Sequence, residues 1–155
     1  MKIIIDDLRG REIAAFLAEH IKEMKSVSPP QSKHALNLED LRKPEITFWT
    51  VWDGDLLVGC GAIKELNLNH AEIKSMRTAV SERGKGVASM LLQHILKEAR
   101  VRGYRRISLE TGSMPFFAPA HYLYAKHGFQ PCTPFASYKE DSNSIFMTKE
   151  LEPML

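Results

Sequence analysis

Cysteine is scarce in this sequence, and long apolar runs are missing. The two cysteines, Cys60 and Cys132, lie 72 positions apart and form no CxxC motif, so they make no disulfide framework and fit a reducing compartment. The longest apolar stretch, Leu56 to Ile63, is far shorter than the ~20 residues of a membrane helix. The N-terminal run Ile3 to Ile5 is too short for the core of a signal peptide. These features predict a soluble, cytoplasmic protein.

A strong excess of one charge is also missing. Lys plus Arg number 21 and Asp plus Glu number 19, a formal net charge of +2. This balance argues against a dedicated nucleic-acid binder and against a polybasic membrane anchor. The six histidines show no HExxH or other tight ligand spacing, so no metal site is predicted. A chain of 155 residues suits one domain, and residues 1–155 are assigned to it.

Two segments carry apolar residues at helical spacing. The first starts at Arg11 and repeats at Ile13, Leu17, Ile21 and Met24; the second repeats at Val87, Leu91, Ile95 and Ala99, and Gly103 ends it. Three β-rich stretches separated by turn signals predict an antiparallel meander: Ile46–Trp52, Leu56–Ile63 and Ala71–Val80. Further elements are expected as strands at Lys2–Ile5, Arg106–Thr111 and Ser144–Lys149 and as helices at Asn37–Leu41 and Pro119–His127. The order β-α-α-β-β-β-α-β-α-β predicts an α+β sheet with helices on both faces.

A glycine-containing loop, Arg83-Gly84-Lys85-Gly86-Val87-Ala88, lies between a predicted strand and the second long helix. Backbone N–H groups that converge there, with a helix N-terminus behind them, suit a phosphate or pyrophosphate. A turn that needs glycine for a positive φ explains the same residues. The loop is neither a Walker A motif, because no Gly-Lys-Ser/Thr follows, nor a dinucleotide fingerprint, because the third glycine is missing.

Two motifs follow one another in the chain: Arg83-x-x-Gly86-x-Ala88 and the segment from Ala120 to Phe129. The first matches an R/Q-x-x-G-x-G/A signature and the second is similar to an A-x-x-L-Y-x-x-x-G-F segment. Both are typical of the GCN5-related N-acetyltransferases (GNAT), and the sequence resembles that family. Further tracts resemble one bacterial subgroup, the YsnE-like acetyltransferases: His34-Ala35-Leu36, the stretch from Glu72 to Thr78, Leu109-Glu110-Thr111-Gly112 and the stretch from Asn143 to Thr148. The resemblance covers nearly the whole chain.

The resemblance implies a fold, an activity and a cofactor. The fold is a mixed, mostly antiparallel sheet whose central strands splay apart, and the cofactor is acetyl-CoA. The thioester is expected in the gap between the strands Ala71–Val80 and Arg106–Thr111. The backbone of the expected cofactor-binding residues would hold the pyrophosphate and pair with the pantetheine: Met76, Thr78, Arg83, Gly84, Lys85, Gly86, Val87 and Ala88.

Transfer of an acetyl group to an amine needs a proton acceptor for the amine and a stabiliser for the departing thiolate. The resemblance assigns the first role to Glu72, which is expected on the same strand face as Met76 because the two are four residues apart. Glu110, on the neighbouring strand, is the rival base. Tyr124 matches the family tyrosine that points at the thioester sulfur; the alternative is a core aromatic on a helix face.

Substrate contacts are assigned less directly. His34 lies in the Ser26–Leu36 loop, which corresponds to the stretch that covers the acceptor pocket in this fold, and Arg77 is a candidate for binding an acceptor carboxylate. A surface loop and a surface ion pair are the alternatives for these two residues. Glu110 is retained as a further residue of the acceptor site.

The preferred function is acetyl transfer from acetyl-CoA to a small-molecule amine. A non-catalytic acyl-CoA sensor of the same fold is one alternative, which the presence of both Glu72 and Tyr124 disfavours. A peptide or protein N-acetyltransferase is another, and it needs an open groove, whereas the Pro29-Pro30 loop and the Phe135–Ser144 segment are expected to close over a small pocket. The family resemblance makes a homodimer possible.

Overall fold

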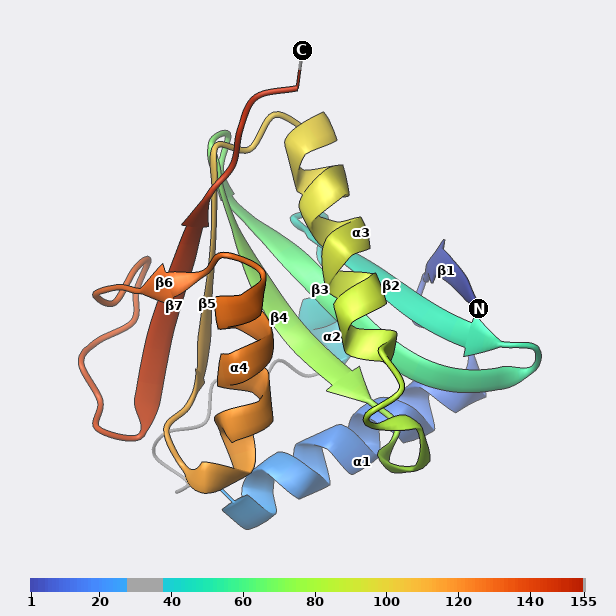
Figure 1. The fold of residues 1–155 in the computed structure, drawn as a ribbon. Coiled ribbons are helices and arrows are strands. Elements are labelled where there is room, and N and C mark those ends of the chain that lie inside the picture. Colours follow the sequence, from blue (N-terminus) through green and yellow to red (C-terminus); the bar gives the residue numbers. More distant parts are fainter. Residues whose placement is uncertain (28–37, 155) are drawn as a thin grey trace.

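The computed structural model describes residues 1–27 and 38–154, and its strands form one seven-stranded sheet in the order β1-β2-β3-β4-β5-β7-β6 (Figure 1). Only the β4–β5 pair is parallel among these described strands. The mixed, mostly antiparallel sheet confirms the predicted fold class. The strands are β1 Lys2–Ile5, β2 Ile46–Asp53, β3 Leu56–Asn67, β4 His70–Thr78, β5 Arg106–Gly112, β6 Gln130–Pro131 and β7 Ser144–Glu150.

Helices cover both faces of the sheet, and each face has its own apolar core. Figure 1 shows α3 and α4 on the viewer's side, where α3 contributes Leu91 and Ile95 to the larger core together with Trp49 of β2. On the other face, Phe16 of α1 and Leu41 of α2 belong to a second core. The helices are α1 Arg11–Val27, α2 Leu38–Leu41, α3 Val87–Val101 and α4 Ala118–Lys126, with 3₁₀ turns η2 Val80–Glu82 and η3 Pro115–Phe117.

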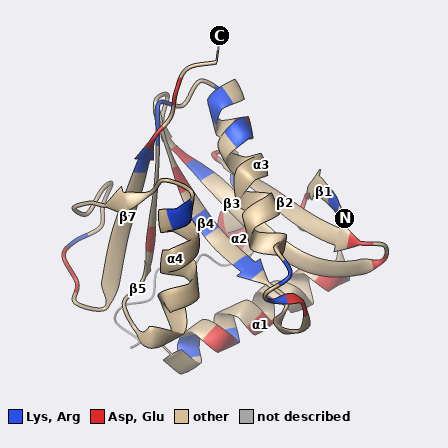
Figure 2. Cartoon of the chain, in the orientation of Figure 1, with Lys and Arg blue, Asp and Glu red and all other residues tan. Residues whose placement is uncertain are grey.

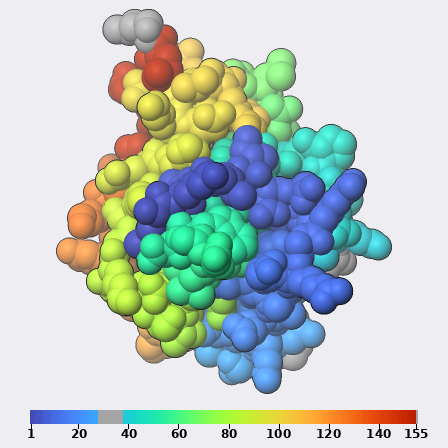
Figure 3. Space-filling model, turned by 90° about the vertical axis from the view of Figure 1, so that its right-hand side faces the viewer, coloured from blue at the N-terminus to red at the C-terminus, as the bar shows by residue number. Residues whose placement is uncertain are grey.

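The N-terminal strand β1 forms one edge of the sheet. It pairs with β2, and Thr50 Oγ1 donates a hydrogen bond of 3.0 Å to Asp6 Oδ2 just beyond β1. Figure 3 shows this side of the molecule, with the blue N-terminal segment and α1 beside the teal β2–β3 turn. The opposite edge is β6, a two-residue strand that the sequence analysis did not predict. Pro131 is tolerated there because an edge strand pairs on one side only.

Strand β4 contains an extra residue that changes which side chains share a face. The register with β3 passes from Ala62↔Lys74 to Cys60↔Arg77, so three steps on β4 match two on β3. Ser75 takes a left-handed φ of 57° at this bulge. As a result Ile73 and Met76 both belong to the larger core although they are three residues apart. The predicted shared face of Glu72 and Met76 is therefore wrong, because Glu72 alternates with Ile73.

Basic residues are concentrated near the C-terminal end of α3 and the start of β5 (Figure 2). They are engaged within the chain: Arg102 Nη1 donates to Thr47 Oγ1 at 2.6 Å, Arg100 Nε to the Glu152 carbonyl at 2.9 Å and Arg106 Nε to Thr148 Oγ1 at 2.9 Å. These contacts within the chain account for the three arginines without a bound nucleic acid. None of the helices in residues 1–27 and 38–154 has the length and hydropathy needed to cross a bilayer.

Candidate active site

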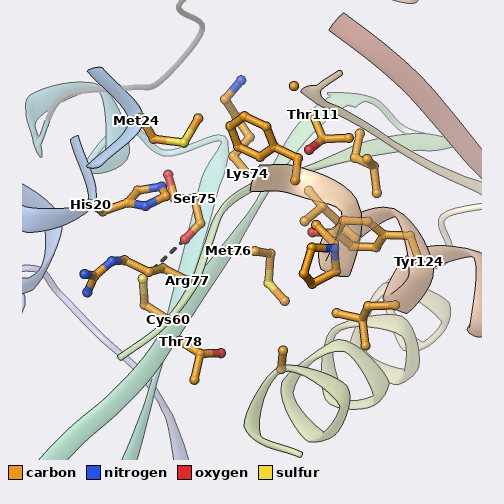
Figure 4. Close-up of a pocket in the computed structure, with 18 of the residues that line it drawn as sticks. His20, Met24, Cys60, Lys74, Ser75, Met76, Arg77, Thr78, Thr111 and Tyr124 are labelled. Atoms are coloured by element: carbon orange, nitrogen blue, oxygen red, sulfur yellow. Dashed lines mark hydrogen bonds between the residues drawn. The ribbon is translucent and has the colours of Figure 1, made fainter. Parts of the chain in front are cut away.

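A cavity of about 660 Å³ opens where β4 and β5 separate. The parallel pairing runs only from His70↔Arg106 to Ile73↔Leu109, and β4 continues to Thr78 past the last pair. The cavity is lined by residues of β4, β5, α1, α3, α4 and the loop before α3. In Figure 4, His20 and Met24 of α1 lie on one side of Met76 and Tyr124 of α4 lies on the other. The gap leaves the β4 backbone from Lys74 to Thr78 without a β5 partner along this edge.

The loop before α3 is a backbone cradle at one end of this cavity. Gly84 and Gly86 take left-handed φ values of 80° and 85°, and a Cβ built at either would meet no atom within 4 Å. Gly86 is the N-cap of α3 and gives the first-turn amides no side-chain acceptor. The turn therefore needs glycine at both positions for the positive φ, and open space lies beside each of them. Such a helix N-terminus favours an anionic phosphate group.

Side chains of the loop hold it to the rest of the fold. Arg83 Nη2 donates to Glu23 Oε1 of α1 at 2.9 Å, and Arg83 Nε donates to the Thr78 carbonyl at 3.3 Å. Lys85 Nζ pairs with Glu82 at 3.3 Å. The guanidinium of Arg83 therefore ties the loop to α1 and to the end of β4.

Glu72 is a buried carboxylate on the cavity wall, with 3% of the residue exposed. Its Oε2 accepts a hydrogen bond of 2.5 Å from the Tyr138 hydroxyl and one of 3.1 Å from Lys74 Nζ. Burial and the Glu72 carboxylate raise the pKa of Tyr138, so this hydroxyl is a donor at neutral pH. The sequence analysis named neither partner as a site residue. Tyr138 gave no motif signal, because it lies in a loop that only the fold brings over β4.

Tyr124 lines the same cavity from α4 and is 5% exposed. Its ring packs edge-on to Phe129, with 5.5 Å between the ring centroids. Burial raises the pKa of its hydroxyl, so the group is protonated at neutral pH and can donate a proton. Within residues 1–27 and 38–154 that hydroxyl has no hydrogen-bond partner. Tyr122, two positions earlier, is 73% exposed.

Arg77 is buried beneath α1 rather than exposed on the surface. Its guanidinium lies 4.5 Å from the centre of the Phe16 ring and 3.7–3.8 Å from carboxylate oxygens of Glu19 and Glu23. The buried Nε has no hydrogen-bond partner in the described part of the chain. Burial, followed by the nearby Arg77 charge, lowers the pKa of His20 to about 4, so that imidazole is neutral. Arg77 therefore forms ion pairs, as the alternative to substrate binding expected, but its own side chain is buried.

The remaining predicted residues are placed as follows. Glu110 lines the cavity from β5 and its Oε2 accepts a hydrogen bond of 2.7 Å from Ser144 Oγ. His34 falls outside the described residues.

Cys60 also lines the cavity, and burial raises the pKa of its thiol to about 12, so it is not a thiolate. In residues 1–27 and 38–154 no three His, Cys, Asp or Glu side chains come together as a metal site would require.

Comparisons with known proteins agree with this architecture. Residues 13–129 match the model of the acetyltransferase (GNAT) family. The chain is 60% identical to the uncharacterized N-acetyltransferase YsnE of Bacillus subtilis (strain 168), over 97% of this chain and 100% of that protein. It is 49% identical to the uncharacterized N-acetyltransferase YedL of Escherichia coli (strain K12), over 94% and 92% of the two chains.

Solved structures show the same fold. A Klebsiella pneumoniae chain provisionally named an acyl-CoA N-acyltransferase matches with a TM-score of 0.79 and 26% identity, over 97% of each chain. A GNAT acetyltransferase of Elizabethkingia anophelis, solved with acetyl-CoA bound, matches with a TM-score of 0.66 and 16% identity, over 97% of each chain. The family match and the two N-acetyltransferase relatives show that the chain belongs to the GNAT family and is an acetyl-CoA-dependent N-acetyltransferase.

Proposed function

We propose that this enzyme transfers the acetyl group directly to the amine of a small molecule, with Glu72 as proton acceptor and Tyr124 as proton donor. One observation carries the proposal. A buried carboxylate and a buried, protonated phenol line a single cavity at the point where β4 and β5 separate, and that cavity reaches the glycine cradle before α3. A sensor that only binds the cofactor needs the cradle and the gap, but it needs neither proton-transfer group.

The residues present fit acetyl-CoA as the acetyl donor. The amides from Arg83 to Ala88 would hold the pyrophosphate, and open space lies beside Gly84 and Gly86 in this loop. The edge of β4 between Lys74 and Thr78 has no β5 partner, and there the backbone of Met76 and Thr78 would pair with an extended pantetheine arm. When bound, acetyl-CoA supplies an activated thioester. Val87 is buried behind the cradle, while the small Ala88 lines the cavity and leaves room beside the first turn of α3.

Glu72 and Tyr124, on the two sides of the gap between β4 and β5, carry out the proton transfers. An ammonium acceptor must lose a proton before its nitrogen can attack, and Glu72 can take that proton directly or through one water. The Tyr124 hydroxyl, protonated because it is buried, can donate to the thiolate that departs. The C–N bond forms as the C–S bond breaks, and the nitrogen loses two protons: one goes to Glu72, and the second replaces the proton that Tyr124 gives to the thiolate. No oxidation state changes, so the balance needs no metal or redox group.

A small acceptor suits this site better than a protein chain. The Tyr138 side chain lies over Glu72 and Lys74, and α1 covers the other side through His20 and Met24. A protein substrate would need an open groove past the base, whereas Glu72 is almost completely covered. We place Arg77 and Glu110 in the walls of this acceptor space.

The test is an acetyl-CoA-dependent thiol-release screen over amines, amino acids and short peptides, with binding of acetyl-CoA followed separately by thermal shift. Turnover with small amines and none with peptides is the expected result. Preferred turnover of peptides would replace the small-molecule acceptor by a protein one. Binding of acetyl-CoA without release of thiol for any acceptor class would favour the sensor.

A further inference from the structure

The side chains of Glu72, Lys74 and Tyr138 are joined to one another by three hydrogen bonds. The Tyr138 hydroxyl and Lys74 Nζ each reach the same carboxylate oxygen, Oε2 of Glu72, at 2.5 and 3.1 Å, and Lys74 Nζ lies 3.0 Å from the Tyr138 oxygen. The other oxygen, Oε1, accepts no hydrogen bond from the described residues. One carboxylate oxygen is therefore held from two sides and the other is left for a ligand.

Tyr138 reaches this position through aromatic packing, which fixes its ring independently of its hydroxyl. The ring lies 5.2 Å from that of Phe135 and 5.5 Å from that of Phe146 on β7. A turn closed by the Tyr138 N–H and the Phe135 carbonyl at 3.1 Å sets the backbone. Removing the hydroxyl alone should therefore leave the ring, and the segment that carries it, in place.

We infer that Tyr138 is a positioning residue for the base: with Lys74 it holds Glu72 through Oε2 and directs Oε1 at the acceptor nitrogen. The inference rests on the proposed role of Glu72. A donor hydroxyl and an ammonium both favour the charged form of a carboxylate. Tyr138 itself does not touch the reacting atoms in this scheme, so its effect on the rate passes through Glu72.

Other charged groups near the three residues set the background for this effect. His70 on β4 lies within electrostatic range of Glu72, and Glu110 on β5 acts on Tyr138. Neither donates a hydrogen bond to Glu72 in the described structure. The two donors to Oε2 are Lys74, on the same strand, and Tyr138, from the segment between β6 and β7.

The chain contains a matched control for the Tyr138 hydroxyl. Tyr104 is 6% exposed and its hydroxyl donates at 2.6 Å to Oε1 of Glu65, an exposed residue at the end of β3, a second tyrosine–glutamate hydrogen bond. Tyr104 and Glu65 are not among the residues that line the described cavity. Tyr104→Phe therefore removes the same kind of bond without touching the base, and it reports the effect of lost stability alone.

The experiment compares the pH profile of kcat/KM for the wild type, Tyr138→Phe and Tyr104→Phe. Loss of the Tyr138 donor should move the acidic limb upward by about one pH unit, the size expected for one hydrogen bond to a charged group. The turnover number near neutral pH should fall several-fold while acetyl-CoA affinity stays unchanged. Tyr104→Phe should keep the wild-type profile.

A second measurement does not depend on turnover. The side-chain carboxyl carbon of ¹³C-labelled Glu72 is followed by NMR against pH, and its titration midpoint should move upward in Tyr138→Phe only. An unmoved midpoint and an unmoved acidic limb would overturn the positioning role. If the wild type turns over no acceptor, the proposed function fails, and the NMR midpoint still decides whether Tyr138 governs the ionisation of Glu72.

Discussion

Glu72 and Tyr124 line one cavity, but their side chains come from opposite sides of the central sheet. Tyr124 belongs to the core beneath α3 and α4, together with Ile73. Glu72 alternates with Ile73 along β4 and contacts Tyr138 on the other side. The two groups can meet one ligand only where β4 and β5 separate, and the proposed reaction therefore takes place in that gap. Their contributions should therefore be separable by mutation.

Replacing Glu72 by glutamine removes the proton acceptor and keeps the size of the side chain. The turnover number should fall about 10²–10⁴-fold, the range for loss of a general base. Acetyl-CoA affinity, measured by titration calorimetry on the same preparation, should survive, because the cradle before α3 is unaffected. The unfolding midpoint of the variant must also be recorded, since Glu72 is paired with Lys74.

The matched variant for this test is Glu110→Gln. Glu110 is the other carboxylate considered for the base, and its Oε2 is bonded to Ser144 Oγ at 2.7 Å. We expect a small effect on turnover. If Glu110→Gln causes the large loss and Glu72→Gln does not, the base lies on β5 and the assignment to β4 is wrong.

Replacing Tyr124 by phenylalanine tests the proton donor. A CoA thiolate is already a fair leaving group, so the turnover number should fall only about 10–100-fold, the lower part of the range for acid–base catalysis. The stability should change little, because the hydroxyl has no bonded partner in residues 1–27 and 38–154 and the ring contact with Phe129 is kept.

Acetyl-CoA affinity and turnover of Tyr124→Phe must be compared in one preparation. Loss of turnover alone supports the donor role. Joint loss of affinity and turnover would make Tyr124 a binding residue, and a wild-type rate would leave it as a core aromatic.

Much of the fold was predictable because helices and hairpins leave local patterns of apolar and turn residues in the sequence. The helical spacing that ends at Ala99 predicted α3, and the turn signal between Ile46–Trp52 and Leu56–Ile63 predicted the β2–β3 hairpin. The two-residue strand β6 was missed because Gln130 and Pro131 carry no strand pattern. Its pairing comes from the long-range partner β7, which supplies bonds that no local preference reveals.

The candidate site was predictable only where a motif marks it. The glycine cradle and Tyr124 carry family signatures, whereas Tyr138 reaches Glu72 across 66 positions of sequence. The bulge at Ser75 was also unforeseen, because serine gives no signal for a left-handed φ. That one inserted residue reverses the alternation beyond it and places Arg77 under Phe16 of α1.

The glycine cradle is tested by Gly86→Val. Acetyl-CoA at 100 times its Kd should stabilise the wild type by about 2.7 kcal/mol, seen as a rise of several degrees in Tm. A Cβ at Gly86 enters the open space beside the amides, so the variant should fold and lose the rise.

The control for this variant is Gly103→Val, at the other end of α3. Gly103 has a φ of 89° against 85° for Gly86, and neither Cβ would meet a neighbour. Both variants should lose about 1–2 kcal/mol or more through left-handed strain. Only Gly86→Val should lose the response to acetyl-CoA, and an equal response in the two variants would remove the pyrophosphate from this loop.

His20 should make the enzyme less stable in mild acid. Burial lowers the pKa of its imidazole from 6.5 to about 4, so between these values the unfolded chain binds a proton that the folded chain does not. The free energy of unfolding therefore falls as the pH drops below 6.5, and His20 alone should account for about 2 kcal/mol between pH 7.5 and pH 5. His20→Gln removes this titration. Urea unfolding at both pH values should show a smaller acid loss in the variant, by about 2 kcal/mol, because other groups titrate equally in both proteins. An identical loss in wild type and variant would mean that the folded protein accommodates a charged imidazole beside Arg77.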